Sequence, residues 1–203
     1  MNYAYARVRS RIIEYLIAAN AFMFLMTITF PPLFNWLSLT PSKILVQPWT
    51  IITSMFLHGS FMHILFNMIA LFFFGTYLER ITSADEFIKI YFAGGLFAGL
   101  AYLFTSLVFG IPSPSVSAVG ASGAIFAVMG ALVVLRPHMT IYINFFFPMP
   151  LWLAAAIFTF FALTSMASGM TGGVAENAHL GGMIAGLIFG YYHKKKAKPQ
   201  AYV

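Results

Sequence analysis

The sequence contains no cysteine and a single aspartate, Asp85. Without cysteine the chain cannot form disulfides, a thiolate nucleophile or a thiolate zinc site. One aspartate rules out a pair of intramembrane aspartates that share a proton, and the sequence has no His-Glu-x-x-His motif. Aspartyl and zinc chemistries of membrane proteolysis are therefore both disfavoured.

Charge is also scarce. Charged residues make up 8% of the 203 residues, against roughly 25% in a soluble domain, while apolar residues reach 61% and mean hydropathy is +0.86. So few polar groups cannot cover an exterior that faces water. The composition predicts an all-α integral membrane protein in contact with the lipid bilayer.

Hydrophobic runs separated by polar, Gly or Pro residues predict a bundle of six transmembrane helices. We expect them at about Ile12 to Phe30, Ser54 to Leu78, Phe87 to Phe109, Ser122 to Leu135, Phe145 to Ala167, and Ala178 to Tyr192. One membrane domain, residues 12–192, then lies between an N-terminal tail, residues 1–11, and a basic C-terminal tail, residues 193–203. No small-residue cleavage site follows the first run, so we expect a retained anchor.

The basic residues predict the orientation. Six spans put both termini on one side, together with every Lys and Arg except Lys43. By the positive-inside rule that side is the cytoplasm. We expect the basic tail to set topology and contact anionic lipid, and we expect no nucleic-acid partner.

Four polar residues are expected at similar depth in the membrane. Ser122 begins a run that ends at Arg136, a length of about 21 Å, whereas the hydrocarbon core is about 30 Å thick. Measured along their own helices from the cytoplasmic charges, His179 lies about 22 Å, His63 about 24 Å and Asn67 about 18 Å into the membrane. Each has an ordinary explanation, such as a small-residue helix contact for Ser122. Their convergence from three helices favours a functional site.

The residue types suggest nucleophilic catalysis. Ser122 starts a helix whose free N–H groups favour an anionic intermediate, and His179 could remove its proton. His63 and Asn67, four residues apart on one helix face, could both donate to an oxyanion. Gly182, Gly186 and Gly190 give the last helix a smooth face for close packing against the short fourth helix.

No third carboxylate is evident. Glu176 is expected in the outer loop and Glu79 at the cytoplasmic helix end, which leaves a Ser/His dyad whose imidazole is held by packing. His58 and His63 are about 140° apart on the expected helix, so they do not form a helical metal pair. We expect neither metal nor cofactor.

Three segments resemble the motif blocks of rhomboid intramembrane serine proteases. They are His58-Gly-Ser-Phe-Met-His63-Ile-Leu-Phe-Asn67, Gly120-Ala-Ser122-Gly123 and Ala178-His179-Leu-Gly-Gly182, in that order along the chain. The resemblance runs from about Trp49 to Gly190. It implies that Ser122 is the nucleophile and His179 the base, and that His63, Asn67 and the Ser122 N–H stabilise the oxyanion. Glu79 matches a structural acidic position, and Thr50 stands where the family often has Arg.

The resemblance to prokaryotic rhomboids implies a protease in the cell (inner) membrane that cuts single-span membrane proteins near the outer face. Two other functions stay open. A catalytically silent rhomboid-like protein would bind transmembrane helices without cutting them, although the retained Ser122 and His179 argue against this. A small transporter would line a path with its polar residues, but the inner halves of the second, fourth and sixth runs are nearly all apolar.

Overall fold

The computed structural model describes residues 10–143, 146–168 and 175–196. Its main helices are α1 (Ile12–Thr29), α4 (Phe61–Ala70), α5 (Thr76–Ile81), α6 (Ala84–Phe109), α7 (Ser122–Leu135), α8 (Leu151–Ser168) and α9 (Glu176–Lys196). The connection between α1 and α4 contains the further helical segments α2 (Pro31–Leu37), η1 (Pro41–Lys43), α3 (Thr50–Thr53) and η2 (Ser54–Phe56). The strands of the described residues form one short hairpin, so the predicted all-α class is confirmed.

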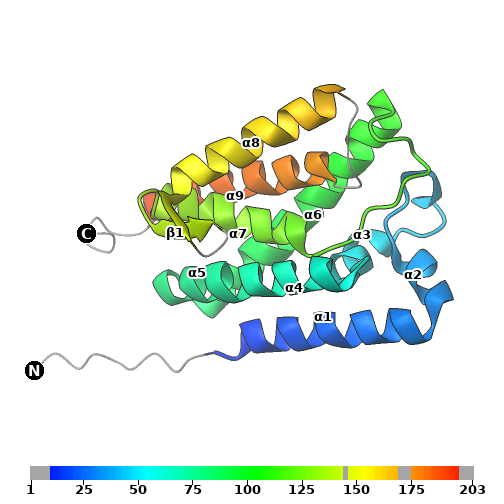
Figure 1. The fold of residues 1–203 in the computed structure, drawn as a ribbon, viewed down its shortest axis with the longest axis horizontal. Coiled ribbons are helices and arrows are strands. Elements are labelled where there is room, and N and C mark those ends of the chain that lie inside the picture. The colour runs from blue at the N-terminus through cyan, green and yellow to red at the C-terminus, as the bar shows by residue number, and fades with distance from the viewer. Residues whose placement is uncertain (1–9, 144–145, 169–174, 197–203) are drawn as a thin grey trace, which may run out of the picture.

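Helix α7 runs through the middle of the bundle, between α4 on one side and α9 and α8 on the other (Figure 1). Glycines let α9 approach it closely. A Cβ atom on Gly182 would lie 2.1 Å from the carbonyl oxygen of Gly123, and one on Gly186 would lie 2.0 Å from that of Ala127. Helix α6 packs as tightly, because a Cβ on Gly94 would lie 2.1 Å from the Ala127 side chain. The predicted packing of the glycine face is therefore confirmed.

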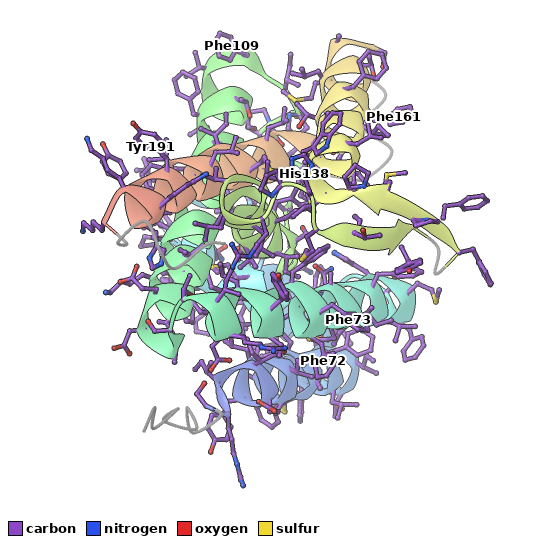
Figure 2. The ribbon with its side chains drawn as sticks, turned by 90° about the vertical axis from the view of Figure 1, so that its left-hand side faces the viewer. Phe72, Phe73, Phe109, His138, Phe161 and Tyr191 are labelled. Atoms are coloured by element: carbon purple, nitrogen blue, oxygen red, sulfur yellow. The ribbon has the colours of Figure 1, made fainter. Side chains whose placement is uncertain are left out.

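The outside of the bundle is apolar. Phe109, Phe161 and Tyr191 lie at its periphery (Figure 2). These three side chains and those of Phe72 and Phe73 are each between 42% and 63% exposed. Among the described residues, four helical stretches are long and apolar enough to cross a membrane: Ile12–Thr29, Phe61–Ile81, Ala84–Phe109 and Leu151–Ser168. Such a surface is stable only against lipid, so the protein is an integral membrane protein.

The second predicted helix is wrong at its start. The expected helix from Ser54 is a 3₁₀ turn, and a non-helical stretch containing His58 precedes α4. Gly59 disfavours helix, and the Ser60 side chain caps α4 by accepting from the His63 N–H. The later part of the span also contains a π-helical turn, η3 (Leu71–Gly75), between α4 and α5.

The fifth predicted helix also begins in the wrong place. The expected first residue, Phe145, lies outside the described residues, but the expected helix also included Phe147–Pro150, which is strand β2 and pairs with β1 (Thr140–Ile143) in an antiparallel hairpin. Pro148 and Pro150 lack N–H donors and hold the preceding residues extended, so α8 begins only after them.

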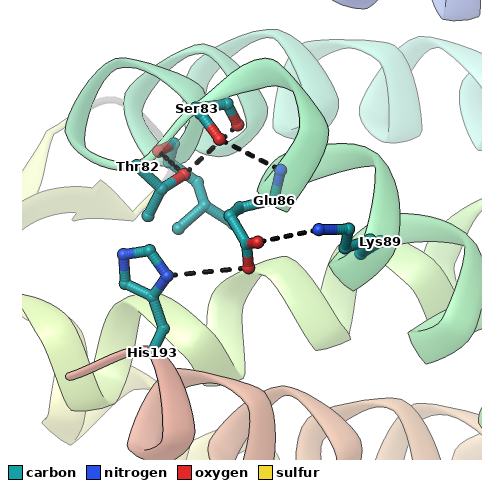
Figure 3. Close-up of polar contacts among 6 residues, drawn as sticks. Thr82, Ser83, Glu86, Lys89 and His193 are labelled. Carbon is teal, nitrogen blue, oxygen red and sulfur yellow. Dashed lines mark hydrogen bonds and ion pairs between the residues drawn. The ribbon is translucent and has the colours of Figure 1, made fainter. Parts of the chain in front are cut away.

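Both ends of the described chain lie at the same end of the bundle (Figure 1). There the hydroxyl of Ser10 donates to Glu79, which ties the start of α1 to α5. Glu86 in the first turn of α6 pairs with Lys89 at 2.9 Å and with His193 of α9 at 3.6 Å (Figure 3). This arrangement accords with an even number of spans.

Candidate active site

Ser122 and His179 form a hydrogen-bonded pair between two helices. Ser122 is the first residue of α7, and His179 lies in the first turn of α9. The Ser122 Oγ atom lies 2.8 Å from His179 Nε2. The contact follows from the close packing of α7 on α9, because a Cβ on Gly182 would strike the backbone of Gly123. This is the geometry of a hydroxyl beside a general base.

The imidazole of His179 is held on two sides. Its ring stacks on that of Phe126, with centroids 4.4 Å apart and planes 15° apart. Its Nδ1 atom lies 3.3 Å from Glu176 Oε2. Glu176 is the first residue of α9 and not part of a loop, so the expectation that no carboxylate reaches the ring is wrong. The three-residue spacing was the available signal, since residues i and i+3 share a helix face.

His63 is oriented by the turn that precedes α4. The backbone N–H of Gly59 donates to His63 Nδ1 at 3.4 Å. A neutral imidazole that accepts at Nδ1 carries its hydrogen on Nε2. A Cβ on Gly120 would lie 2.8 Å from that Nε2 and 3.6 Å from Ser122 Oγ. His63 Nε2 and the hydroxyl of Ser122 therefore both lie close to Gly120, and both residues line the same cavity.

Asn67 lies one turn further along α4 and is buried. Its side-chain Nδ2 donates to the His63 carbonyl oxygen at 2.9 Å. An amide group has two N–H donors, so the second can reach an oxygen in the cavity. Ser122, as the first residue of α7, also has a backbone N–H without an intrahelical acceptor.

Two glycines shape the backbone around Ser122. Gly120 has φ +124°, a conformation that residues with a side chain rarely adopt, and its N–H donates to the Ser54 carbonyl oxygen at 2.9 Å. Gly123 packs against α6, where a Cβ would lie 2.5 Å from that of Ala98. Glycine at both positions lets the chain approach His63 and α6 without a clash.

The four polar residues open into one cavity of about 490 Å³. Its lining includes His63, Asn67, Ser122 and His179, together with apolar and small groups from α4, α7 and the segment before α7. A second cavity of about 280 Å³ lies on the other side of the His179 ring, between α8 and α9, and Glu176 lines it. His179 and Phe126 form part of both walls.

His58 lies in the turn before α4 and is 2% exposed. Its ring meets that of His63 edge to face, with centroids 5.0 Å apart. The expected separation around one helix is wrong, because His58 is outside the helix. Within the described ranges, no group of three or more potential ligands is placed to hold a metal ion.

Comparison with known proteins gives consistent matches. A model of the Rhomboid domain matches residues 46–196. RHOMBOID-like protein 12, mitochondrial, of Arabidopsis thaliana is 33% identical over 68% of this chain and 44% of its own length. For Rhomboid protein 1, mitochondrial, of Saccharomyces cerevisiae the values are 34%, 74% and 43%. Rhomboid protease GluP of Bacillus subtilis is 42% identical over 41% of this chain and 15% of its own length. The chain thus spans less than half the length of these curated relatives.

Proposed function

Because the chain belongs to the rhomboid family, we propose that it is an intramembrane serine endopeptidase. The observation that carries the proposal is the 2.8 Å contact of Ser122 Oγ with His179 Nε2 at the start of a helix inside an apolar bundle. Polar side chains at this depth are costly unless they serve a function. The name of the matched Bacillus relative, a rhomboid protease, supports the same activity.

In the proposed reaction, Ser122 Oγ attacks a peptide carbonyl carbon while its proton passes to His179 Nε2. The carbonyl oxygen becomes an oxyanion, which accepts hydrogen bonds from His63 Nε2, Asn67 Nδ2 and the Ser122 backbone N–H. His179 then gives the proton to the leaving amine. A water molecule attacks the acyl-enzyme in the same way, releases the carboxylate product and restores Ser122.

The proposed substrates are transmembrane helices of other proteins. A helix in lipid keeps its carbonyl groups hydrogen-bonded, so the substrate must unwind locally before Ser122 can attack it. Helix-weakening Gly or Pro near the cut should therefore favour cleavage. The crowded turn at Gly120 suggests that a small residue precedes the scissile bond.

We also propose how the protein is oriented in the membrane. Tails in the cytoplasm and a site near the outer face follow from the distribution of Lys and Arg. The prokaryotic cell membrane stays a prediction, because the matched relatives include both mitochondrial and bacterial proteins.

The test uses purified protein in detergent, a single-span model substrate and a fluorophosphonate probe that labels activated serines. Ser122→Ala should abolish both cleavage and labelling, and His179→Ala should lose cleavage to a comparable extent. The double variant should be no worse than either single one, because a nucleophile and its base act as a unit. Ser115→Ala, which changes an exposed serine, is the matched control. Cleavage by Ser122→Ala at the wild-type rate would refute the assignment.

A further inference from the structure

We propose that Glu176 is a positioning residue for His179, so that the site is a triad of Ser122, His179 and Glu176 in which Glu176 orients the imidazole. This inference rests on the function proposed above. Its basis is the line of contacts on which Ser122 Oγ lies 2.8 Å from His179 Nε2 and Glu176 Oε2 lies 3.3 Å from His179 Nδ1. The carboxylate and the hydroxyl thus occupy opposite nitrogens of one ring.

The carboxylate selects the reactive tautomer. His179 can accept the Ser122 proton at Nε2 only if the neutral ring carries its hydrogen on Nδ1. An ionised carboxylate accepts hydrogen bonds and donates none, so contact with Glu176 Oε2 favours the Nδ1–H tautomer. Stacking on Phe126 fixes the plane of the ring but leaves both tautomers possible. The carboxylate contact therefore supplies something that packing alone does not.

The surroundings strengthen this contact. The side chains of His179 and Glu176 are 13% and 22% exposed. The cavity on the Glu176 side is walled mainly by apolar residues, among them Phe158, Phe161 and Met183. A charge interaction is stronger where apolar groups displace water. When His179 takes up the Ser122 proton, its positive charge forms beside this carboxylate.

Proton transfer balances without any further group. The Ser122 proton moves to Nε2, and the Nδ1 hydrogen stays on the ring while it is shared with Glu176 Oε2. No proton passes to Glu176 in these steps, and the Nε2 proton then leaves with the amine product. Glu176 contributes orientation and charge stabilisation, and it does not itself transfer a proton.

A second Glu–His contact in the molecule provides a matched control. At the opposite end of α9, His193 Nδ1 lies 3.6 Å from Glu86 Oε2, and Lys89 binds the same carboxylate (Figure 3). This pair has the same chemistry as Glu176 with His179 but lies at the other end of the bundle. Glu86→Gln therefore makes the same chemical change without touching the site.

The experiment measures kcat and KM on the single-span substrate, the rate of fluorophosphonate labelling and the melting temperature in detergent. In Glu176→Gln the amide oxygen still accepts the Nδ1 hydrogen but carries no charge, whereas Glu176→Ala removes both functions. We expect kcat to fall about 10-fold for Gln and about 100-fold for Ala, the range of a charge-assisted hydrogen bond. Labelling should slow in parallel, while KM, the melting temperature and the Glu86→Gln control should stay close to wild type.

Two results would overturn the proposed positioning role of Glu176. One is wild-type kcat and labelling in Glu176→Gln and Glu176→Ala. The other is a loss of kcat that follows a lower melting temperature in both variants, which would make Glu176 a structural residue. Either result leaves the serine protease assignment intact if Ser122→Ala is inactive. If the wild-type protein neither cleaves the substrate nor is labelled by the fluorophosphonate probe, the proposed function is refuted, and the proposed role of Glu176 with it.

Discussion

Each histidine that lines the main cavity has a neighbour that favours one position for its ring hydrogen. The Gly59 N–H donates to His63 Nδ1 and leaves the hydrogen on Nε2, close to Gly120. Glu176 approaches Nδ1 of His179 and leaves Nε2 free to accept. In the proposed reaction the two histidines of this cavity have opposite tasks, His63 as a donor and His179 as a base. The same residue type can serve both because its tautomer depends on local contacts.

Asn67 tests the oxyanion proposal at this scale. Asn67→Ala should lower kcat by about 10² to 10³, because one oxyanion donor acts mainly in the transition state, and KM should change little. The control is Asn20→Ala in α1, since Asn20 Nδ2 also donates to the carbonyl four residues earlier, at 2.8 Å. Steady-state kinetics at equal amounts of folded protein decide the matter. A rise in KM alone would show that Asn67 contacts substrate.

At the scale of elements, the site depends on how closely α9 approaches α7. Ser122 and His179 lie on different helices, and their contact exists because the facing positions carry no side chain. Gly130 extends the close contact between α7 and α9, since a Cβ there would lie 2.4 Å from the Met183 carbonyl oxygen. The same contacts hold the bundle together and set the distance between Ser122 and His179.

Gly186→Ala should therefore reduce both stability and activity. In an exposed helix this change would stabilise by about 1 kcal/mol, but here the new methyl would lie 2.0 Å from the Ala127 carbonyl oxygen. Overpacking of this kind costs about 1–3 kcal/mol. We expect a lower melting temperature and slower fluorophosphonate labelling. Gly59→Ala is the control for the melting temperature, because a Cβ there meets nothing within 4 Å. Equal melting temperatures of the two variants would show that the close contact between α7 and α9 does not limit stability.

At the scale of the whole molecule, a mainly apolar interior also holds a few buried polar side chains, and His58 is one of them. His58 lies just before the second span, and its side chain is buried although Gly59 and Ser60 of the same turn are exposed. Burial, with a smaller contribution from the nearby His63, lowers the pKa of His58 from 6.5 to about 4. The folded protein therefore holds this side chain neutral over a range in which the unfolded chain protonates it.

This difference makes stability depend on pH. Between pH 6.5 and about 4 the unfolded state binds more protons, so the free energy of unfolding should fall as the pH is lowered, by at most about 3 kcal/mol. Melting temperatures in detergent across this window measure the effect. His58→Asn should flatten the slope, whereas His138→Asn, which changes an exposed histidine, should preserve it. An unchanged slope in His58→Asn would contradict the linkage.

The sequence by itself determined the membrane class, the short α7 from Ser122 to Leu135 and the glycine face of α9, because these depend on composition and on periodicity along one segment. It also indicated Ser122, His179, His63 and Asn67 as candidates, because helix length sets depth. Only the tertiary structure decided that Glu176 meets Nδ1 of His179. That contact depends on where α9 begins and how it lies against α7 and α8. The hairpin before α8 was likewise decided by the tertiary structure. The backbone N–H and C=O groups of an apolar segment must be hydrogen-bonded, either within a helix or to a neighbouring strand, and here β1 and β2 bond to each other.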